Sequence, residues 1–322
     1  MDVRTMADLR RLTLEQLAAM DIAAVNLACA ENPCGSEVLD VDSSLRKLDL
    51  WAAVVARETQ RLLPRFAENP DYYDRSEPTF RVVTLVLTLK NLLGVHYNLD
   101  QAVAPTFEDS RDQFLHGLTD SSRGGTCVSM PVLMVAIGRR LGYPLKLALA
   151  HEHVYFRWDD GISPPLNFEC TNPQGMDSHP DEHYMVWPRS MSAIDLDHRE
   201  FLVSLTPKEE LSLFLAARGH CLLANGRIDE AREAYRTAVR LFPTARQFRI
   251  CLSELEARFA PPRPRFSVPD PSEQLVQPRL VEPRLPIPPI PRVAEQRRQQ
   301  NALPLPKRAG GVTPNERIGG PP

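Results

Sequence analysis

The spacing of hydrophobic residues predicts that the chain begins with helices. From Leu9 to Met20 the apolar residues recur at roughly helical intervals. A longer helical pattern runs from a cap at Ser43-Ser44 to about Ala67, and a third spans Thr79 to Leu93 and ends before Gly94. The apolar stripe of the longer pattern consists of Leu45, Leu48, Trp51, Val55 and Leu62. We therefore expect an N-terminal helical region over residues 1–105.

In the middle of the chain the pattern changes to a helix followed by strands. Residues 95–125 are irregular, whereas Val128–Leu141 is apolar nearly all round and indicates a buried helix. Three strand-like runs come next, namely Leu145–Ala150, His153–Trp158 and Leu166–Thr171. A helix followed by antiparallel strands is typical of an α+β fold, so we expect an α+β domain over residues 106–206.

Residues 207–260 return to a helical pattern with small residues where two helices would cross. The small residues are Gly219, Ala231 and Ala238, while Gly226 stands at the turn, Tyr235 at an aromatic position and Pro243 at the closing position. In this register Leu211–Pro243 resembles one tetratricopeptide repeat, and an ordinary helical hairpin is the alternative. Because a single repeat is not normally stable alone, we expect it to pack on the rest of the chain or on a partner.

The last segment, residues 261–322, differs in composition from the rest. It contains 16 of the 30 prolines, which is typical of polyproline-like stretches rather than of a packed core. Its ten Arg or Lys and five Asp or Glu give a net charge of +5, which leaves −8 on the first 260 residues of a chain with a net charge of −3. We expect a disordered Pro/Arg-rich tail. A docking segment for a partner and a solubilising tail are both compatible with it.

Charge and composition narrow the class of protein. A net charge of only −3 favours neither nucleic acid nor a membrane as a partner. The start, MDVRTMADLRR, lacks the apolar run of a signal peptide, and the longest apolar stretch, Val82–Leu89, is far shorter than the roughly 20 residues of a spanning helix. Six cysteines without a CxxC pair do not indicate a disulfide framework. We expect a reduced, cytoplasmic protein.

Cys127 is the first candidate for chemistry. It follows Gly124-Gly125-Thr126 and stands at or just before the start of the buried helix, a placement that Pro131 supports because proline is tolerated near a helix start. At that end the helix dipole and unpaired amides favour a thiolate, the nucleophilic form of cysteine. The Cys127 amide would be a first oxyanion donor, and the sequence indicates no second. The alternative is that Cys127 is a small buried apolar residue.

His153 and Glu169 are further candidates, on successive predicted strands. If Phe156 opposes Phe168, His153 lies opposite Thr171 and diagonal to Glu169. A two-residue slip would place His153 directly opposite Glu169. Both registers allow a hydrogen bond between the imidazole and the carboxylate, so the sequence leaves the register open.

Together the three residues predict an activated thiol. The nucleophile stands at a helix start, the base on a strand and an orienting carboxylate on the next strand. The carboxylate would fix the tautomer of the imidazole and stabilise the imidazolium. Taken singly, His153 is also compatible with a solvated strand histidine, and Glu169 with a plain surface charge.

Three segments resemble the motifs of the transglutaminase-like superfamily, which has a papain-type fold. Gly125-Thr126-Cys127 and the apolar helix through Arg139–Pro144 resemble its first motif. His153–Phe156 is similar to the second, and Asn167–Thr171 to the third, in which aspartate is usual at the place of Glu169. More narrowly, residues 10–245 resemble the bacterial SirB-like branch, which joins N-terminal helices, this core and tetratricopeptide material.

This resemblance implies a thiol enzyme that acts on amide bonds of a protein or peptide substrate. Cys127 would be the nucleophile that forms an acyl-enzyme, His153 the base and Glu169 the orienting residue. The reaction would be that of a hydrolase (peptidase or amidase) or of an acyltransferase, and no cofactor is implied. Because some SirB-like relatives lack the cysteine, the alternative is a catalytically inactive scaffold that binds protein partners through the repeat or the tail.

The other histidines and cysteines are assigned no chemistry. The pairs His151/His153 and His179/His183, with Cys170 between them, have spacing too loose to predict a metal site. The remaining cysteines are interpreted as packing residues, namely Cys29, Cys34, Cys221 and Cys251.

Overall fold

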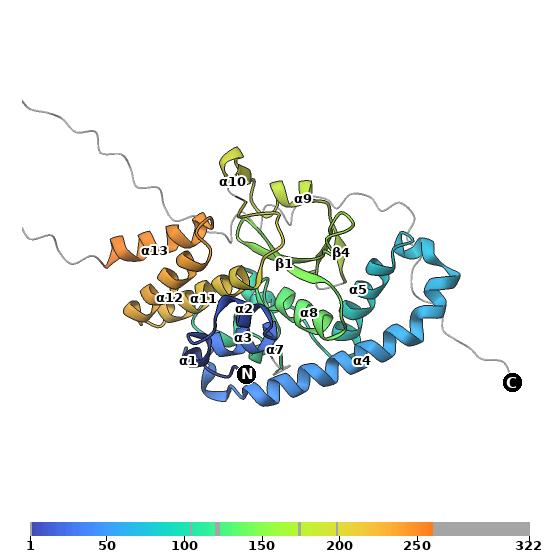
Figure 1. Ribbon diagram of the computed structural model, residues 1–322, viewed down its shortest axis with the longest axis horizontal. Helices are drawn as coiled ribbons and strands as arrows, with labels where there is room; N and C mark the ends of the chain where they lie inside the picture. Colours follow the sequence, from blue (N-terminus) through green and yellow to red (C-terminus); the bar gives the residue numbers. More distant parts are fainter. Residues whose placement is uncertain (1, 104, 120–122, 173–174, 198, 260–322) are drawn as a thin grey trace, which may run out of the picture. The chain divides into compact units, whose positions relative to one another are not determined.

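Helices come first along the chain, then one sheet, then helices again (Figure 1). The computed structural model describes residues 2–103, 105–119, 123–172, 175–197 and 199–259. The mixture of helices with an antiparallel sheet agrees with the predicted α+β class. The predicted Pro/Arg-rich tail, residues 261–322, lies outside the described residues.

Side-chain caps begin the main N-terminal helices. Thr5, Thr13, Asp21, Asp40 and Ser76 each accept a hydrogen bond from an amide of the first turn. The elements of this region are α1 (Met6–Leu9), α2 (Leu14–Ala18), α3 (Ile22–Cys29), η1 (Ser36–Val38), α4 (Val41–Glu68), η2 (Pro70–Tyr73), α5 (Glu77–Leu87), the π-helical turn η3 (Thr88–Leu92) and α6 (Leu99–Val103).

The structure corrects the start of the long helix α4. Its cap is Asp40, whose carboxylate accepts from the amide of Ser43 at 2.9 Å. Ser44 is instead buried and bonds the hydroxyl of Thr119 at 3.1 Å, so it is not free to cap the helix. The predicted apolar stripe is confirmed at its centre, where Leu48 and Val55 are fully buried.

A four-stranded antiparallel sheet, in the order β1-β2-β3-β4, follows helix α8. The elements of this part are η4 (Ser110–Asp112), α7 (His116–Thr119), α8 (Ser129–Arg140), β1 (Leu145–Ala150), β2 (His153–Trp158), β3 (Leu166–Glu169), β4 (Asp177–Ser178), α9 (Asp181–Val186) and α10 (Ala193–Asp197). Only His151 and Glu152 connect β1 to β2, and Glu152 takes the left-handed conformation that so tight a hairpin requires.

Of the two registers left open by the sequence, the structure has the one that pairs Phe156 with Phe168. Strand β3 ends at Glu169, two residues earlier than predicted. The reason is local, because the amide of Thr171 donates to the Glu169 carboxylate at 2.8 Å rather than to a neighbouring strand.

Helix α8 lies at the centre of the hydrophobic core. Every residue from Ser129 to Gly138 is buried, as its nearly uniform apolar pattern predicted. The helix packs against α3, α4 and α5 and also against β1 and β2. One hydrophobic cluster runs through these elements and contains residues from Val3 to Phe248. This main cluster therefore extends from the first helices to the last, and two smaller clusters lie around Tyr235 and Tyr155.

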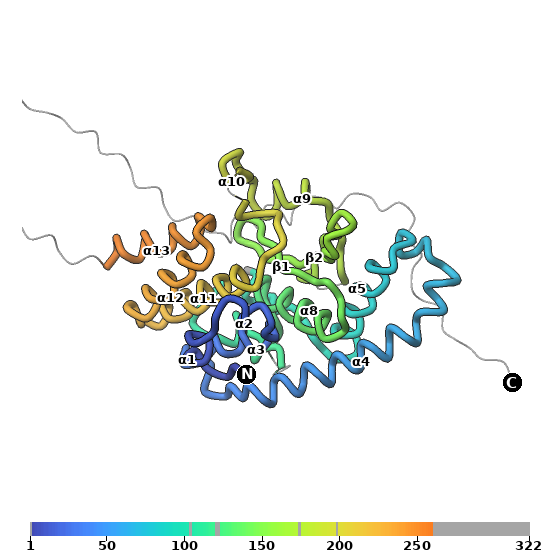
Figure 2. The backbone as a smooth tube through the Cα atoms, viewed as in Figure 1, coloured from blue at the N-terminus to red at the C-terminus, as the bar shows by residue number. Residues whose placement is uncertain are grey.

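The final helices are α11 (Pro207–Ala224), α12 (Ile228–Leu241) and α13 (Arg246–Arg258). A methyl group at Gly219 would come within 2.6 Å of the Tyr235 ring, which explains the need for glycine at this crossing. Helix α11 packs on α2 and α3, so the repeat is covered by the rest of the chain, as expected (Figure 2). Among the described helices, none has the length and apolar character needed to cross a membrane.

Candidate active site

The turn that carries Cys127 requires two glycines. Gly124 has a φ of +78°, and a side chain at Gly125 would come within 2.7 Å of Leu118 and Met130. The amide of Gly125 donates to the carbonyl of His96 at 2.9 Å, and the carbonyl of Gly125 accepts from Asn98 at 2.8 Å. A short bridge thus fixes the backbone two residues before Cys127.

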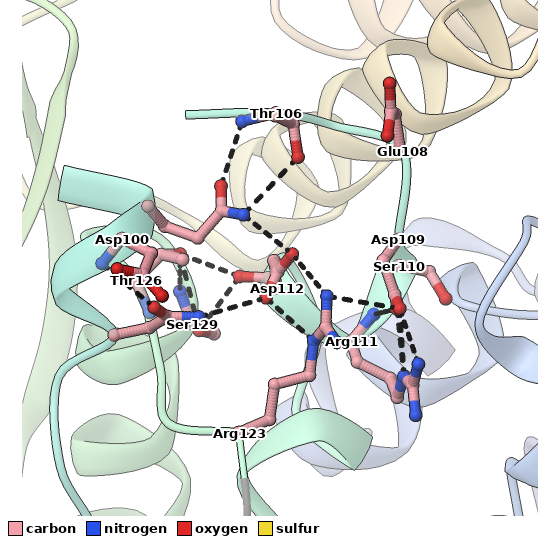
Figure 3. Close-up of polar contacts among 12 residues, drawn as sticks. Asp100, Thr106, Glu108, Asp109, Ser110, Arg111, Asp112, Arg123, Thr126 and Ser129 are labelled. Carbon is pink, nitrogen blue, oxygen red and sulfur yellow. Dashed lines mark hydrogen bonds and ion pairs between the residues drawn. The ribbon is translucent and has the colours of Figure 1, made fainter. Parts of the chain in front are cut away.

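Thr126 and Ser129 hold the other side of this turn (Figure 3). The hydroxyl of Thr126 donates to the carbonyl of Asp112 at 2.8 Å, and its amide donates to Ser129 Oγ at 2.9 Å. The hydroxyl of Ser129 also reaches the Asp112 carbonyl, at 3.3 Å. Cys127 is therefore placed by hydrogen bonds on both sides, two residues before α8 begins.

The carboxylate of Asp112 is the centre of a polar network beneath the turn (Figure 3). Asp112 has 0% of its surface exposed, and its two oxygens accept from Nε and Nη2 of Arg123, each at 3.0 Å. Gln101 Nε2 donates to the same carboxylate at 3.1 Å, and Asp109 pairs with Arg123 at 3.2 Å. Sequence reasoning missed this network, because its members lie in segments without periodic pattern.

Cys127 is half-buried, so part of the residue is accessible to solvent. Its N–H group has no hydrogen-bond acceptor within the described part of the chain. The helix that follows also leaves its first amides without partners in the helix itself. An anionic oxygen placed beside the sulfur would meet a free backbone donor.

His153 and Glu169 are brought together by the sheet. His153 Nε2 lies 2.6 Å from Glu169 Oε2, and each residue has 5% of its surface exposed. In the observed register Glu169 is diagonal to His153, so the acidic side chain must span more than the distance between directly opposed residues. The additional methylene of glutamate, relative to aspartate, supplies that reach.

The second oxygen of Glu169 is also satisfied. Oε1 accepts from the amide of Thr171 at 2.8 Å and from its hydroxyl at 2.6 Å. Burial would raise the pKa of Glu169, but the imidazolium of His153 and the hydrogen bonds from His153 and Thr171 lower it to about 2. Glu169 is therefore an anion at neutral pH.

The Cys127 side chain also acts on the pKa of His153. Burial would lower the pKa of His153, but the Glu169 carboxylate and side-chain hydrogen bonds with Cys127 and Glu169 raise it to about 9. Because Nε2 faces Glu169, the nitrogen left for the Cys127 side chain is Nδ1. The structure thus joins His153 to Glu169 by a hydrogen bond, and the Cys127 side chain is near enough to raise the pKa of the same imidazole.

Aromatic side chains from α9 and the residue that follows it cover this set. The ring of Trp187 meets the ring of His153 edge to face, with centroids 4.7 Å apart. His183 lies 5.4 Å from Trp187 and stacks on His179 at 3.8 Å. Burial, His179 and His153 lower the pKa of His183, so its ring is neutral beside the His153 imidazolium.

Lys90 fixes the segment that follows β3. Its ammonium donates to the carbonyls of Asn172 and Gly175, each at 2.6 Å. Burial lowers the pKa of Lys90, although Cys170 and Glu169 oppose this change. The π-helical turn η3 thereby supports the strand end that carries Glu169.

The histidines and the cysteine considered for a metal site do not come together in the structure. His151 lies 3.1 Å from Asp195, away from the His179/His183 pair, and Cys170 is fully buried. Among the described residues, no group of three or more His, Cys, Asp or Glu could hold a metal ion.

The packing interpretation of the four remaining cysteines is wrong for one of them. Cys29 and Cys221 are fully buried and Cys251 is half-buried, but Cys34 is exposed. Cys34 lies just past α3, beside the left-handed Gly35, where the chain turns at the surface.

Comparison with known proteins identifies one family. Residues 212–245 match the tetratricopeptide repeat family model, which confirms the repeat predicted at Leu211–Pro243. No curated protein and no solved structure matches the chain. The repeat supports a role in binding other proteins.

Proposed function

We propose that this chain is a transglutaminase-like thiol enzyme that acts on amide bonds through an acyl-enzyme on Cys127. The single observation that carries the proposal is the buried contact of His153 Nε2 with Glu169 Oε2 at 2.6 Å, on an imidazole whose pKa the Cys127 side chain also raises. A nucleophile, a base and a group that orients the base are the parts that such chemistry needs. All three were chosen from the sequence for this role.

In the proposed reaction the sulfur of Cys127 attacks the carbonyl carbon of an amide. The carbonyl oxygen becomes an oxyanion and accepts a hydrogen bond from the free Cys127 N–H. His153 donates its proton to the departing amine, the C–N bond breaks, and a thioester remains on Cys127. His153 then removes a proton from a water molecule or an amine, which attacks the thioester and releases Cys127.

The role proposed for Glu169 is to hold His153. Its carboxylate fixes the ring through Nε2 and stabilises the imidazolium form, while Thr171 fixes the carboxylate. Trp187 covers one edge of the imidazole and would exclude water from the ion pair.

Thiol alkylation of the full chain tests the proposal. Iodoacetamide should label Cys127 at pH 6 at least about tenfold faster than it labels Cys34, because only Cys127 has an imidazolium partner. Cys34 is the suitable reference, since it is exposed and Cys29 and Cys170 are buried. The rate of each site is read by mass spectrometry of peptides.

His153→Ala should remove the difference between Cys127 and Cys34. Profiling with thiol-directed acyl probes should label the wild type and leave Cys127→Ser unlabelled. Equal, slow labelling of Cys127 and Cys34 in the wild-type chain would contradict the enzyme proposal.

A second candidate function is a scaffold that binds proteins without catalysis. The match of residues 212–245 to the tetratricopeptide repeat favours it. In this case the SirB-like arrangement of an N-terminal helical region (1–105), a core (106–206) and a repeat (207–260) would serve binding alone, together with the tail (261–322). Slow labelling of Cys127 together with binding of a partner would support the scaffold.

A further inference from the structure

An apolar groove lies between the first two helices and α12 of the repeat. It has a volume of about 360 Å³ and lies between α1 and α2 on one side and α12 on the other, with α11 as its floor. Its apolar lining consists of Met6, Leu9, Leu12, Leu14, Leu17, Leu211, Leu215, Leu222, Ala234 and Leu241. Leu14, at its edge, has 59% of its surface exposed.

Arg218 lines this groove from α11 and is a buried cation, with 8% of its surface exposed. Its Nη1 donates to the carbonyls of Cys29, at 3.0 Å, and Glu31. No carboxylate of the described residues forms an ion pair with Arg218. A buried charge normally has a charged partner, because removal from water is costly without one.

The carboxylates near Arg218 are already engaged elsewhere. Glu230 pairs with Arg227 at 2.6 Å, and Glu31 accepts from the amide of Met6 at 2.8 Å. Both act on Arg218 only at longer range, and burial lowers the pKa of Arg218 in spite of them. The positive charge of Arg218 in the groove is therefore not neutralised locally.

Two arginines at the edge of the groove add to this charge. Arg10 and Arg240 are exposed, and neither forms an ion pair within the described ranges. Arg240 donates only to the hydroxyl of Thr237, at 3.2 Å. The lining of the groove also contains two carboxylates, Glu230 and Glu233. Because Glu230 is paired with Arg227, Glu233 is the one left in the lining to balance the three arginines.

We propose that this groove binds an acidic, leucine-rich peptide segment of a partner protein. Its apolar side chains fill the space between α2 and α12, and one of its carboxylates pairs with Arg218. A second carboxylate reaches Arg240 or Arg10. Complementary charge gives such a site specificity for acidic over basic peptides. This inference rests on the interaction role and is independent of chemistry at Cys127.

Binding is tested with the full chain carrying Cys127→Ser, so that no acyl-enzyme contributes. The probe is a fluorescein-labelled 14-residue amphipathic peptide with Leu on one face and Glu on the other, and its counterpart has Lys at every Glu. Fluorescence anisotropy measures the two dissociation constants. The acidic peptide should bind at least about tenfold more tightly, as expected for the loss of one well-placed charge pair.

Variants of the groove locate the binding site. Arg218→Gln and the double variant Arg10→Gln/Arg240→Gln should each weaken binding of the acidic peptide about tenfold or more. Arg236→Gln is the matched control. Arg236 lies on α12, as Arg240 does, but it pairs with Glu256 outside the groove. If Arg218→Gln fails to fold, the double variant decides, since both of its residues are exposed.

Three results would overturn the inference. Equal binding of the acidic and basic peptides would remove the role of the arginines. Equal binding by the wild-type groove and the double variant would place the site elsewhere. Binding of phosphatidylglycerol vesicles in place of the peptide, lost in the double variant, would assign the groove to a membrane surface. None of these results changes the labelling of Cys127.

Discussion

At the scale of single residues, His153 and Glu169 stabilise one another as an ion pair that also depends on pH. The folded pKa of His153, about 9, is above its ordinary value of 6.5, so its contribution is complete below pH 6.5 and is lost as the pH rises through 9. The folded pKa of Glu169, about 2, is below its ordinary value of 4.5, so its contribution is present above pH 4.5 and is lost as the pH falls through 2. The pair stabilises most between these two ordinary values.

Glu169→Gln should therefore reduce the free energy of unfolding by about 3–5 kcal/mol near pH 6, because it leaves His153 buried without its counter-charge. The difference from the wild type should shrink as the pH rises from 6.5 to 9. Urea unfolding at several pH values measures it. The control is Glu182→Gln, an exposed residue of α9, which should leave stability unchanged. A difference that grows with pH would contradict the assignment of the charges.

The sequence predicted which residues meet, but not all of how they meet. The alternation of side chains in strands was enough to put His153 and Glu169 within reach of each other. Their register depends on the pairing of Phe156 with Phe168, which tertiary packing decides. Asp112 could not be found at all, because its partner Arg123 comes from a loop in which no period relates position to contact.

At the scale of elements, the start of α8 depends on a buried carboxylate. Asp112→Asn keeps the size of the side chain but removes the charge that pairs with Arg123. We expect a loss of about 1–3 kcal/mol in stability, since the buried side chain loses its charged hydrogen bonds while Arg123 keeps its ion pair with Asp109. Labelling of Cys127 by iodoacetamide should slow in the folded variant, because the turn that holds Cys127 loosens.

Asp49→Asn is the matched control for this element. Asp49 forms an exposed ion pair with Arg140 at the other end of α8, and such pairs contribute at most about 1 kcal/mol. Its Cys127 labelling should equal that of the wild type. If iodoacetamide labels Cys127 as fast in Asp112→Asn as in Asp49→Asn, the network does not position the thiol.

At the scale of the whole molecule, helices and the sheet share one main hydrophobic cluster, beside smaller clusters around Tyr235 in the repeat and Tyr155 in the sheet. The cluster that runs from Val3 to Phe248 joins the first helices, α8, the sheet and α11. The boundaries predicted at 105/106 and 206/207 followed changes in sequence pattern and stay predictions. A change in the hydrophobic pattern marks where helices give way to strands or strands to helices. Whether two segments unfold together depends instead on whether their apolar faces pack against each other.

Heating should accordingly unfold residues 2–259 in one transition. Gly219→Ala, a change within the repeat, tests this expectation. The added methyl meets Tyr235 and should lower the free energy of unfolding by about 1–3 kcal/mol. The midpoint should fall equally by tryptophan fluorescence, which reports on Trp51 in α4 and on Trp158 and Trp187 near the sheet, and by circular dichroism, which reports on all helices. Loss of helix ahead of the fluorescence change would indicate that the repeat unfolds separately.

The short connection between β1 and β2 has a consequence for inherited or engineered changes in chain length. With only His151 and Glu152 between the strands, one inserted or deleted residue cannot be absorbed by slack. If the two-residue turn were kept, β2 would slip by one residue against β1, each of its side chains would turn to the opposite face, and the imidazole would leave Glu169. Length at this hairpin is therefore constrained more tightly than residue identity.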